Sequence, residues 1–297
     1  MISYFQAIVI GLLQGVTELF PISSLGHSVL LPAWLGWDGL VTAQSADESF
    51  YLAFVVALHV ATALALLVYY RAEWARIIRG FFRTLRTRHI ETPDERLAWL
   101  LVVATIPAGL TGLALEHALR TVFAKPLAAA IFLTVNGLIL LAGERFRRRA
   151  SVRSLVTTHA TAHAPGGEEG RRLDTLEFKE AGVVGVAQIG ALFAGVSRSG
   201  ITMVAGLVRG LDHEDAARFS FLLATPIILA AGVYKVPDLA GHLGNGIRGQ
   251  ALAGAVAAGL AASVSVRFLV RFFQTRTLLP FAIYSLIVGG LSIIRFA

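Results

Sequence analysis

Six apolar segments of 17 to 21 residues limit what this chain can fold into. A helix needs about 20 apolar residues to cross the hydrocarbon core of a bilayer. The whole chain is 56% hydrophobic and only 15% charged, which is more apolar than ordinary soluble domains. The sequence therefore predicts an all-α integral membrane protein with six transmembrane helices, at residues 50–70, 97–115, 127–143, 216–236, 251–270 and 278–294.

Two further apolar segments, residues 2–37 and 178–211, are each broken by Ser and Gly. The pieces on either side of a break are too short to span, so we expect two re-entrant helix hairpins. A shift of 174 positions superposes the two segments: Gly11, Gln14, Ser23 and Gly26 fall on Gly185, Gln188, Ser197 and Gly200. Repeated, Gly-interrupted apolar segments indicate inverted-topology repeats with a binding site near the membrane midplane.

These segments divide one membrane domain, residues 1–297, into two repeat halves. The first half is predicted at 1–147, with the hairpin at 2–37, and the second at 178–297, with the hairpin at 178–211. The hydrophilic stretch between them, 148–177, is predicted to be a cytoplasmic linker.

The placement of the basic residues predicts how the chain is oriented in the membrane. The formal net charge is +7, yet Lys and Arg gather in a few connections between apolar segments, as the positive-inside rule requires, and this argues against a nucleic-acid partner. With residues 71–96 in the cytoplasm, 20 of the 26 Lys and Arg residues lie on that side. The first hairpin then enters from outside and the second from the cytoplasm, so that their tips can meet within the membrane.

The tip of the first hairpin carries polar groups that are costly in a bilayer unless they serve a site. Gln14 and Glu18 are four residues apart and share a helix face. Ser23 and Ser24 open a new short helix, where free backbone N–H groups favour an anion. His27 follows Ser24 by three residues, which can place its imidazole beside the hydroxyl.

The tip of the second hairpin supplies Ser197, Arg198, Ser199 and Thr202, which are hydroxyl donors around a guanidinium suited to phosphate oxygens. Together the tips predict a site for a phosphate ester. Each piece has a plainer alternative: the Ser-Gly breaks could only punctuate helices, and Arg198 could only neutralise a structural Glu18. His59, in the first span, could touch the site or be a packed histidine, and it is left out of the catalytic set.

At these residues the sequence resembles the undecaprenyl-diphosphate phosphatase family of bacterial inner-membrane enzymes, of the bacitracin-resistance type. The first family motif is matched by Gln14, Glu18, Pro21, Ser23, Ser24, Gly26 and His27. The second is matched by Gly195, Ser197, Arg198, Ser199, Gly200 and Thr202. Similarity extends over nearly the whole chain except about residues 148–175. The sequence departs from the two family motifs at two notable positions: Gln14 stands where many members have Glu, and Ala194 stands where the second motif has proline.

The resemblance implies hydrolysis of undecaprenyl diphosphate to the monophosphate and inorganic phosphate. This reaction recycles the lipid carrier of cell-wall polymers and confers bacitracin resistance. The resemblance also implies an active site reached from the periplasmic side, and a homodimer surrounded by membrane lipids. The alternative from another class is an inverted-repeat transporter or flippase for a prenyl phosphate or another anionic lipid, which would need no nucleophile or base.

These observations predict a role for each site residue. The catalytic residues are Glu18, Ser24, His27 and Arg198, and the substrate-binding residues are Ser23, Gly26, Ser197, Ser199 and Thr202. Gln14 and Glu18 are expected to hold a divalent cation, Mg or Ca, as a cofactor. The attacking group is left open between Ser24, His27 and a water molecule.

Overall fold

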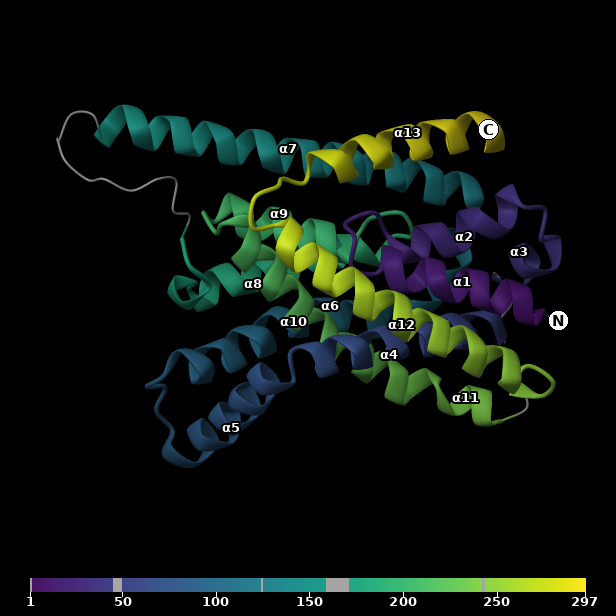
Figure 1. Cartoon of the computed structure of the whole chain (residues 1–297), viewed down its shortest axis with the longest axis horizontal. Helices are drawn as coiled ribbons and strands as arrows, with labels where there is room; N and C mark the ends of the chain where they lie inside the picture. The colour runs from purple at the N-terminus through teal and green to yellow at the C-terminus, as the bar shows by residue number, and fades with distance from the viewer. Residues whose placement is uncertain (1, 45–49, 124, 159–170, 242–243) are drawn as a thin grey trace.

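The computed structural model of the chain describes residues 2–44, 50–123, 125–158, 171–241 and 244–297 (Figure 1). Within these residues, regular structure is helical, and one isolated bridge joins Arg171 to Leu211. The predicted all-α class is therefore confirmed.

Six helices are long and apolar enough to cross a membrane, as predicted. They are α4 (Phe50–Tyr69), α6 (Pro93–Phe123), α7 (Pro126–Thr158), α10 (His213–Lys235), α12 (Arg248–Phe272) and α13 (Leu279–Phe296). Helix α7 runs well past the predicted end of its span at residue 143. Its extension, residues 144–158, contains five Arg residues, which favour helix, and adding a turn to an existing helix needs no new nucleation. Residues 148–158 of the expected linker are thus helical, and 159–170 lie outside the described residues.

Shorter helices fill the two segments predicted as hairpins. The first contains α1 (Tyr4–Thr17) and α2 (Ser24–Trp34), and the second contains α8 (Phe178–Ala187), the 3-10 turn η2 (Gln188–Leu192) and α9 (Arg198–Val208). The remaining helices lie at the ends of the bundle: α3 (Asp38–Gln44), α5 (Arg71–Thr87), η1 (Leu173–Thr175) and α11 (Pro237–Ala240).

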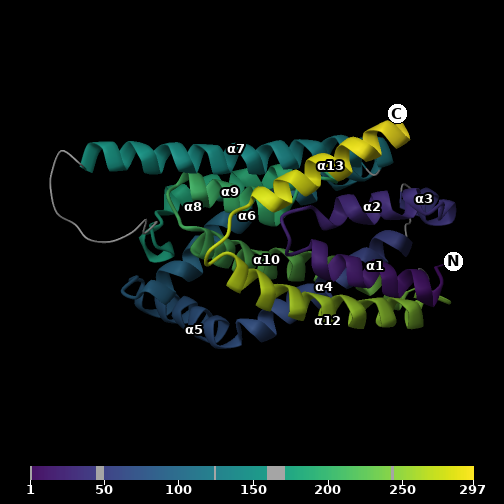
Figure 2. The ribbon, with the colours of Figure 1, turned by 45° about the horizontal axis from the view of Figure 1, so that its top comes forward.

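The two short-helix segments approach each other from opposite ends of the molecule (Figures 1 and 2). Helices α1 and α2 lie toward the end that holds the N-terminus, and α8 begins near the opposite end, packed against α6. This arrangement agrees with the alternation of sides in the predicted topology. The membrane boundaries, the re-entrant character of the segments and the inverted repeats stay predictions.

Local sequence explains where the helices of the two segments begin. Ser3 caps α1 in a reciprocal capping box with Gln6. Ser23 caps α2 by accepting from the N–H of Gly26 at 3.2 Å, and Ser197 caps α9 by accepting from that of Gly200 at 3.1 Å. The two caps are 174 residues apart, the same shift that superposes the segments in the sequence. The two tips therefore share the same side-chain cap, although the backbone at Ser23 has positive φ and that at Ser197 is extended.

Helix α1 is held against α12 by a close approach of small residues. A Cβ atom added at Gly11 would collide with the carbonyl of Gly254, and one at Gly15 would collide with that of Ala258. Such close backbone packing is how helices associate firmly where the hydrophobic effect is weak. It fixes α1, and with it the polar residues at its carboxyl end, relative to the spans.

Candidate active site

The tips of the two short-helix segments meet, as predicted. The N–H of Gly195 donates to Ser23 Oγ at 3.1 Å, and Arg198 Nη2 donates to Glu18 Oε1 at 2.9 Å. Asn136, on α7, joins both tips: its Nδ2 donates to the carbonyl of Pro21, and its Oδ1 accepts from the N–H of Ser197. Three elements far apart in the sequence are thus fixed to one another.

The turn that leads into α2 is strained at Ser23. This residue has φ of 70° and ψ of 101°, a conformation that a side chain disfavours and that costs about 1–3 kcal/mol. Three contacts stabilise this strained conformation. Ser23 Oγ accepts from the N–H groups of Gly26 and Gly195, and the carbonyl oxygen of Ser23 lies 2.7 Å from His27 Nδ1. The outcome is that Ser24 is presented as the first residue of α2.

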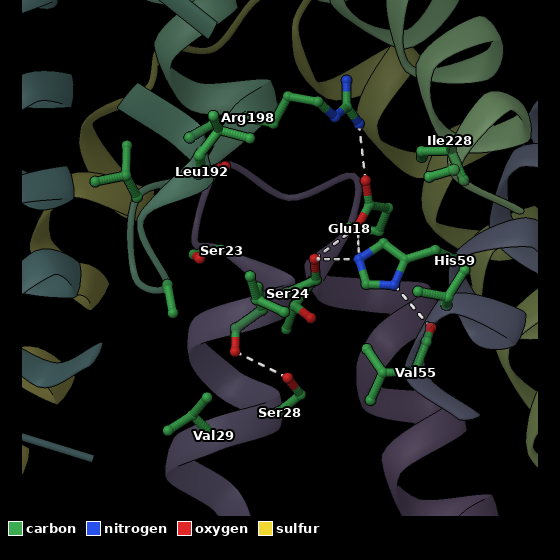
Figure 3. Close-up of a pocket in the computed structure, with 18 of the residues that line it drawn as sticks. Glu18, Ser23, Ser24, Ser28, Val29, Val55, His59, Leu192, Arg198 and Ile228 are labelled. Atoms are coloured by element: carbon green, nitrogen blue, oxygen red, sulfur yellow. Dashed lines mark hydrogen bonds and ion pairs between the residues drawn. The ribbon is translucent and has the colours of Figure 1, made fainter. Parts of the chain in front are cut away.

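A cavity of about 400 Å³ lies beside this turn (Figure 3). Glu18, Ser24, His59, Ser197 and Arg198 supply polar side chains to its lining. Helices α4 and α10 and the turn η2 supply an apolar part of the lining: Leu52, Val55, Val56, Leu192, Ile227, Ile228 and Ala231. A cavity with a polar cluster and an extended apolar wall suits an amphiphilic ligand, with a charged head and a hydrocarbon tail.

Glu18 is the hub of the polar cluster (Figure 3). Its Oε1 accepts from Arg198, while its Oε2 accepts from Gln14 Nε2 at 3.1 Å and from Ser24 Oγ at 2.6 Å. His59 Nε2 lies 3.2 Å from the same oxygen. A buried carboxylate is tolerated when it is paired and hydrogen-bonded in this way. Glu18 therefore joins the serine of one tip to the guanidinium of the other.

His59 is the site residue that sequence reasoning left out. It lies in the middle of α4, and its Nε2 is 3.4 Å from Ser24 Oγ. The only sequence signal was a histidine inside an apolar span, which a packed side chain would also produce. Its position beside Ser24 depends on how α4 packs, and local sequence does not encode that.

The expected contact between His27 and Ser24 does not form. His27 Nδ1 lies 2.7 Å from the Ser23 carbonyl, and its Nε2 lies 2.8 Å from the hydroxyl of Tyr284 on α13. The rings of His27 and Tyr284 stack with centroids 5.7 Å apart, and His27 is not among the residues lining the cavity. Both ring nitrogens are thus engaged away from the hydroxyl of Ser24.

The remaining predicted binding residues divide into two groups. Ser23 and Ser197 line the cavity beside Arg198. Ser199 and Thr202 are buried away from it: Ser199 Oγ contacts Ser197 Oγ and the Phe20 carbonyl, and Thr202 Oγ1 bonds Ser220 Oγ at 2.7 Å. Gly26 does not line the cavity either, and its lack of a side chain lets Gly195 approach. Gly26, Ser199 and Thr202 therefore stabilise the packing of the tips and do not line the cavity.

The residues at Gln14 and Glu18 fit a protein-held divalent cation poorly. Such ions prefer several oxygen ligands, including carboxylates, and within the described residues no group of three or more Asp, Glu, His or Cys side chains could hold one. Gln14 turns its amide nitrogen toward Glu18, and both Glu18 oxygens already accept from protein donors. Only Gln14 Oε1, which is buried and lacks a hydrogen-bond partner among the described residues, is open. The cation stays a prediction.

Gln14→Glu tests that prediction. A second carboxylate beside Glu18 is expected to increase the affinity for calcium or magnesium, because paired carboxylates favour a divalent ion. The cation concentration that gives half of the maximal rise in unfolding temperature should fall by about tenfold or more. Thermal unfolding in detergent against cation concentration measures it. Gln188→Glu, which buries a carboxylate at the equivalent position of the second segment, is the matched control. An unchanged cation dependence in Gln14→Glu would count against a cation at this position.

Gly195→Ala tests whether the contact between the tips is needed. Gly195 has φ of +118°, and an added Cβ would collide with backbone atoms of Ala129 and Leu133. We expect a loss of about 1–3 kcal/mol of stability together with most of the activity, because the N–H that holds Ser23 would shift. Gly109→Ala on α6, where a Cβ meets no atom within 4 Å, should change neither. Thermal unfolding and turnover of both variants measure the difference, and an unimpaired Gly195→Ala would contradict the prediction.

Comparison with known proteins agrees with this geometry. The family model described as bacitracin resistance protein BacA matches residues 7–291. A protein of Frankia alni named undecaprenyl-diphosphatase 2 is 59% identical, over 100% of this chain and 98% of its own length. One of Mycolicibacterium paratuberculosis named undecaprenyl-diphosphatase is 57% identical over the same shares, and one of Chromobacterium violaceum named undecaprenyl-diphosphatase 2 is 43% identical over 96% and 95%. The chain belongs to the bacitracin resistance protein BacA family.

Proposed function

We propose that this protein hydrolyses undecaprenyl diphosphate to undecaprenyl phosphate and inorganic phosphate. One observation carries the proposal: in a member of this family, a serine hydroxyl, a carboxylate and a guanidinium meet at the polar part of an otherwise apolar cavity. The diphosphate would bind at the polar cluster, and the first part of the prenyl chain would lie against the apolar wall. The relatives' names support this substrate.

Arg198 and two helix N-termini would hold the diphosphate. Ser24 and Arg198 are the first residues of α2 and α9, so free N–H groups and the positive dipole ends of both helices lie beside the cavity. Arg198 contacts the Ser220 carbonyl through Nη1 and Glu18 through Nη2, and a guanidinium has five N–H donors in total. The diphosphate oxygens would take the remaining donors, which also stabilise charge on the transferred phosphoryl group.

Ser24 is the nucleophile of the proposed reaction. Its oxygen lines the cavity, whereas His27 does not, and the bond to Glu18 holds that oxygen in place. Ser24 Oγ attacks the terminal phosphorus, and the bond from that phosphorus to the bridging oxygen breaks. The bridging oxygen keeps the electron pair and leaves with the lipid monophosphate. Water then hydrolyses the phosphoserine, which releases inorganic phosphate and restores Ser24.

The cell's inner membrane is the proposed location, with the cavity reached from the periplasmic side. The charge distribution supports this orientation, since it places the N-terminal end of α1 and the connection through α3 outside. The homodimer is proposed on the family resemblance, and the mass of the detergent-solubilised protein tests it.

The test is phosphate release from a long-chain prenyl diphosphate by the purified protein in detergent, with magnesium or calcium supplied. We expect release of one phosphate per lipid, and much slower release from a diphosphate without a lipid tail. Absence of release from a folded protein would overturn the proposal. Movement of the same lipid across liposomes without phosphate release would support the transporter alternative instead.

A further inference from the structure

We propose that His59 is a catalytic residue that takes the proton of Ser24 as the serine oxygen attacks phosphorus. This inference rests on the proposed phosphatase function and identifies the base which that function requires. The histidine of the first family motif, His27, is bound to Tyr284 and lies outside the cavity lining. His59 comes instead from α4, lines the cavity and faces Ser24.

The distances place one nitrogen of His59 at the serine. Nε2 lies 3.4 Å from Ser24 Oγ and 3.2 Å from Glu18 Oε2. The serine hydroxyl donates to Glu18 at 2.6 Å, so rotation of its hydrogen about the Cβ–Oγ bond would redirect the proton toward Nε2 without moving either oxygen or nitrogen. Catalytic hydrogen bonds are often long before substrate binds and shorten in the reactive complex. The geometry is that of a base next to its proton donor.

The other ring nitrogen determines the tautomer. Nδ1 lies 2.8 Å from the carbonyl oxygen of Val55, one turn back on α4. A carbonyl only accepts, so Nδ1 must carry a hydrogen in this arrangement. In the neutral ring Nε2 is then the unprotonated nitrogen. It lies 3.4 Å from Ser24 Oγ and 3.2 Å from Glu18 Oε2, to which only the protonated ring would donate. The helix backbone thus fixes the tautomer of the neutral imidazole, and that tautomer can accept the proton of Ser24.

The surroundings of His59 suit a charge that appears during the reaction. When Nε2 takes the proton, the imidazolium lies beside the Glu18 carboxylate, while Arg198 binds the other oxygen of that carboxylate. The side chains of Glu18, Arg198 and His59 are 5%, 14% and 19% exposed, so the pair interacts with little screening by water. Glu18 offsets the new positive charge and orients the ring. It does not need to become protonated itself.

The proton balance of both steps closes with His59. In the first step Ser24 forms a bond to phosphorus, its proton moves to Nε2, and the lipid monophosphate leaves as a dianion without needing a proton. In the second step water attacks the phosphoserine, the P–Oγ bond breaks, and Nε2 returns its proton to Ser24 Oγ. Inorganic phosphate leaves with both hydrogens of the water, as a monoanion. No other reactant is required.

His59→Gln is the test, because glutamine keeps a polar group of similar reach and cannot take up a proton near neutral pH. We expect kcat to fall at least about 100-fold, within the usual range for general acid–base catalysis, while KM changes less than about threefold. The parent's rate should fall on the acid side as one group becomes protonated, and this limb should be absent in His59→Gln. His89→Gln, which changes an exposed histidine outside the site, should behave like the parent.

Several results would overturn the proposal. A His59→Gln enzyme within threefold of the parent, or a slow one that keeps the parent's acid limb, would leave His59 with a positioning role only. His59→Asn is a second variant in case glutamine does not pack, and a parent rate without any acid limb would overturn the proposal even if neither variant folds. Ser24→Ala is measured in parallel. If Ser24→Ala retains full activity, Ser24 is not the nucleophile and the proposed mechanism is overturned. If Ser24→Ala is inactive while His59→Gln is fully active, only the role of His59 as the base is overturned.

Discussion

Ser24→Ala is expected to lower phosphate release from a prenyl diphosphate by at least ~10³-fold. Removing a nucleophile abolishes the covalent route, and what remains is the stabilisation that the other groups give to attack by water. Binding should change little, because Arg198 and the N-termini of α2 and α9 are untouched. Glu18 Oε2 keeps its contacts with Gln14 and His59, so the fold should persist with a loss of about 1.5–3 kcal/mol for the missing charge-assisted hydrogen bond.

Two measurements check this expectation. Single-turnover reaction with substrate labelled in its terminal phosphate should leave label on acid-quenched parent protein and none on Ser24→Ala. Ser263→Ala is the matched control, because Ser263 is also a helical serine, on α12, and its hydroxyl donates to the Gly259 carbonyl of its own helix. Label on the parent and rapid turnover by Ser263→Ala are expected together. Full activity in Ser24→Ala would show that Ser24 is not the nucleophile.

Much of this architecture could be predicted from the sequence because the bilayer constrains it strongly. The six spans follow from apolar length, and their number and approximate positions are confirmed. The equivalence of Ser23 and Ser197 was visible as a repeat, and both residues cap a short helix in the same way. The meeting of the tips followed from the sides on which the segments were predicted to enter, and the Glu18–Arg198 ion pair confirms it.

What the sequence could not provide is which side chains reach the cavity. His27 is three residues from Ser24, yet its ring bonds the Ser23 carbonyl and Tyr284 instead. His59 is 35 residues away and reaches Ser24 because α4 packs beside the tips. Asn136 joins the tips from α7 although nothing in its local sequence marks it. Motif spacing fixes neighbours along a helix, but contacts between helices depend on packing.

The single carboxylate of the cluster has a physical consequence. Glu18 shares Oε2 between Gln14 and Ser24 and faces one guanidinium and one imidazole. A second carboxylate at position 14 would repel Glu18 unless a cation lay between them. The amide of Gln14 instead donates a hydrogen bond to Glu18, so both Glu18 oxygens are satisfied by protein groups, while Gln14 Oε1 lacks a partner among the described residues. This accounts for the poor fit of a protein-held cation here.

Arg198→Lys is expected to lower kcat/KM about 100-fold or more. In the parent, the planar guanidinium of Arg198 donates to both Glu18 and the Ser220 carbonyl and has further N–H donors for the cavity. Lysine keeps the positive charge but loses this planar set of donors. Loss of one well-placed donor to a transition-state oxygen typically costs 10²–10³ in rate, that is about 2.7–4 kcal/mol. Arg267→Lys, on the exposed face of α12, is the matched control and should remain at the parent's activity. A lysine variant within threefold of the parent would show that the planar guanidinium is not needed for turnover.

Arg198→Ala and its combination with Glu18→Gln separate the structural role of the ion pair from its catalytic role. Alanine alone leaves the buried Glu18 carboxylate without its guanidinium, which is expected to cost about 3–5 kcal/mol of stability. Adding Glu18→Gln removes that unpaired charge, so the double variant should unfold at a higher temperature than Arg198→Ala. Activity should stay lost, because neither the phosphate-binding cation nor the carboxylate that orients Ser24 is restored. If activity returned along with stability, Arg198 would serve only to neutralise Glu18, and phosphate binding would have to be assigned to the helix N-termini alone.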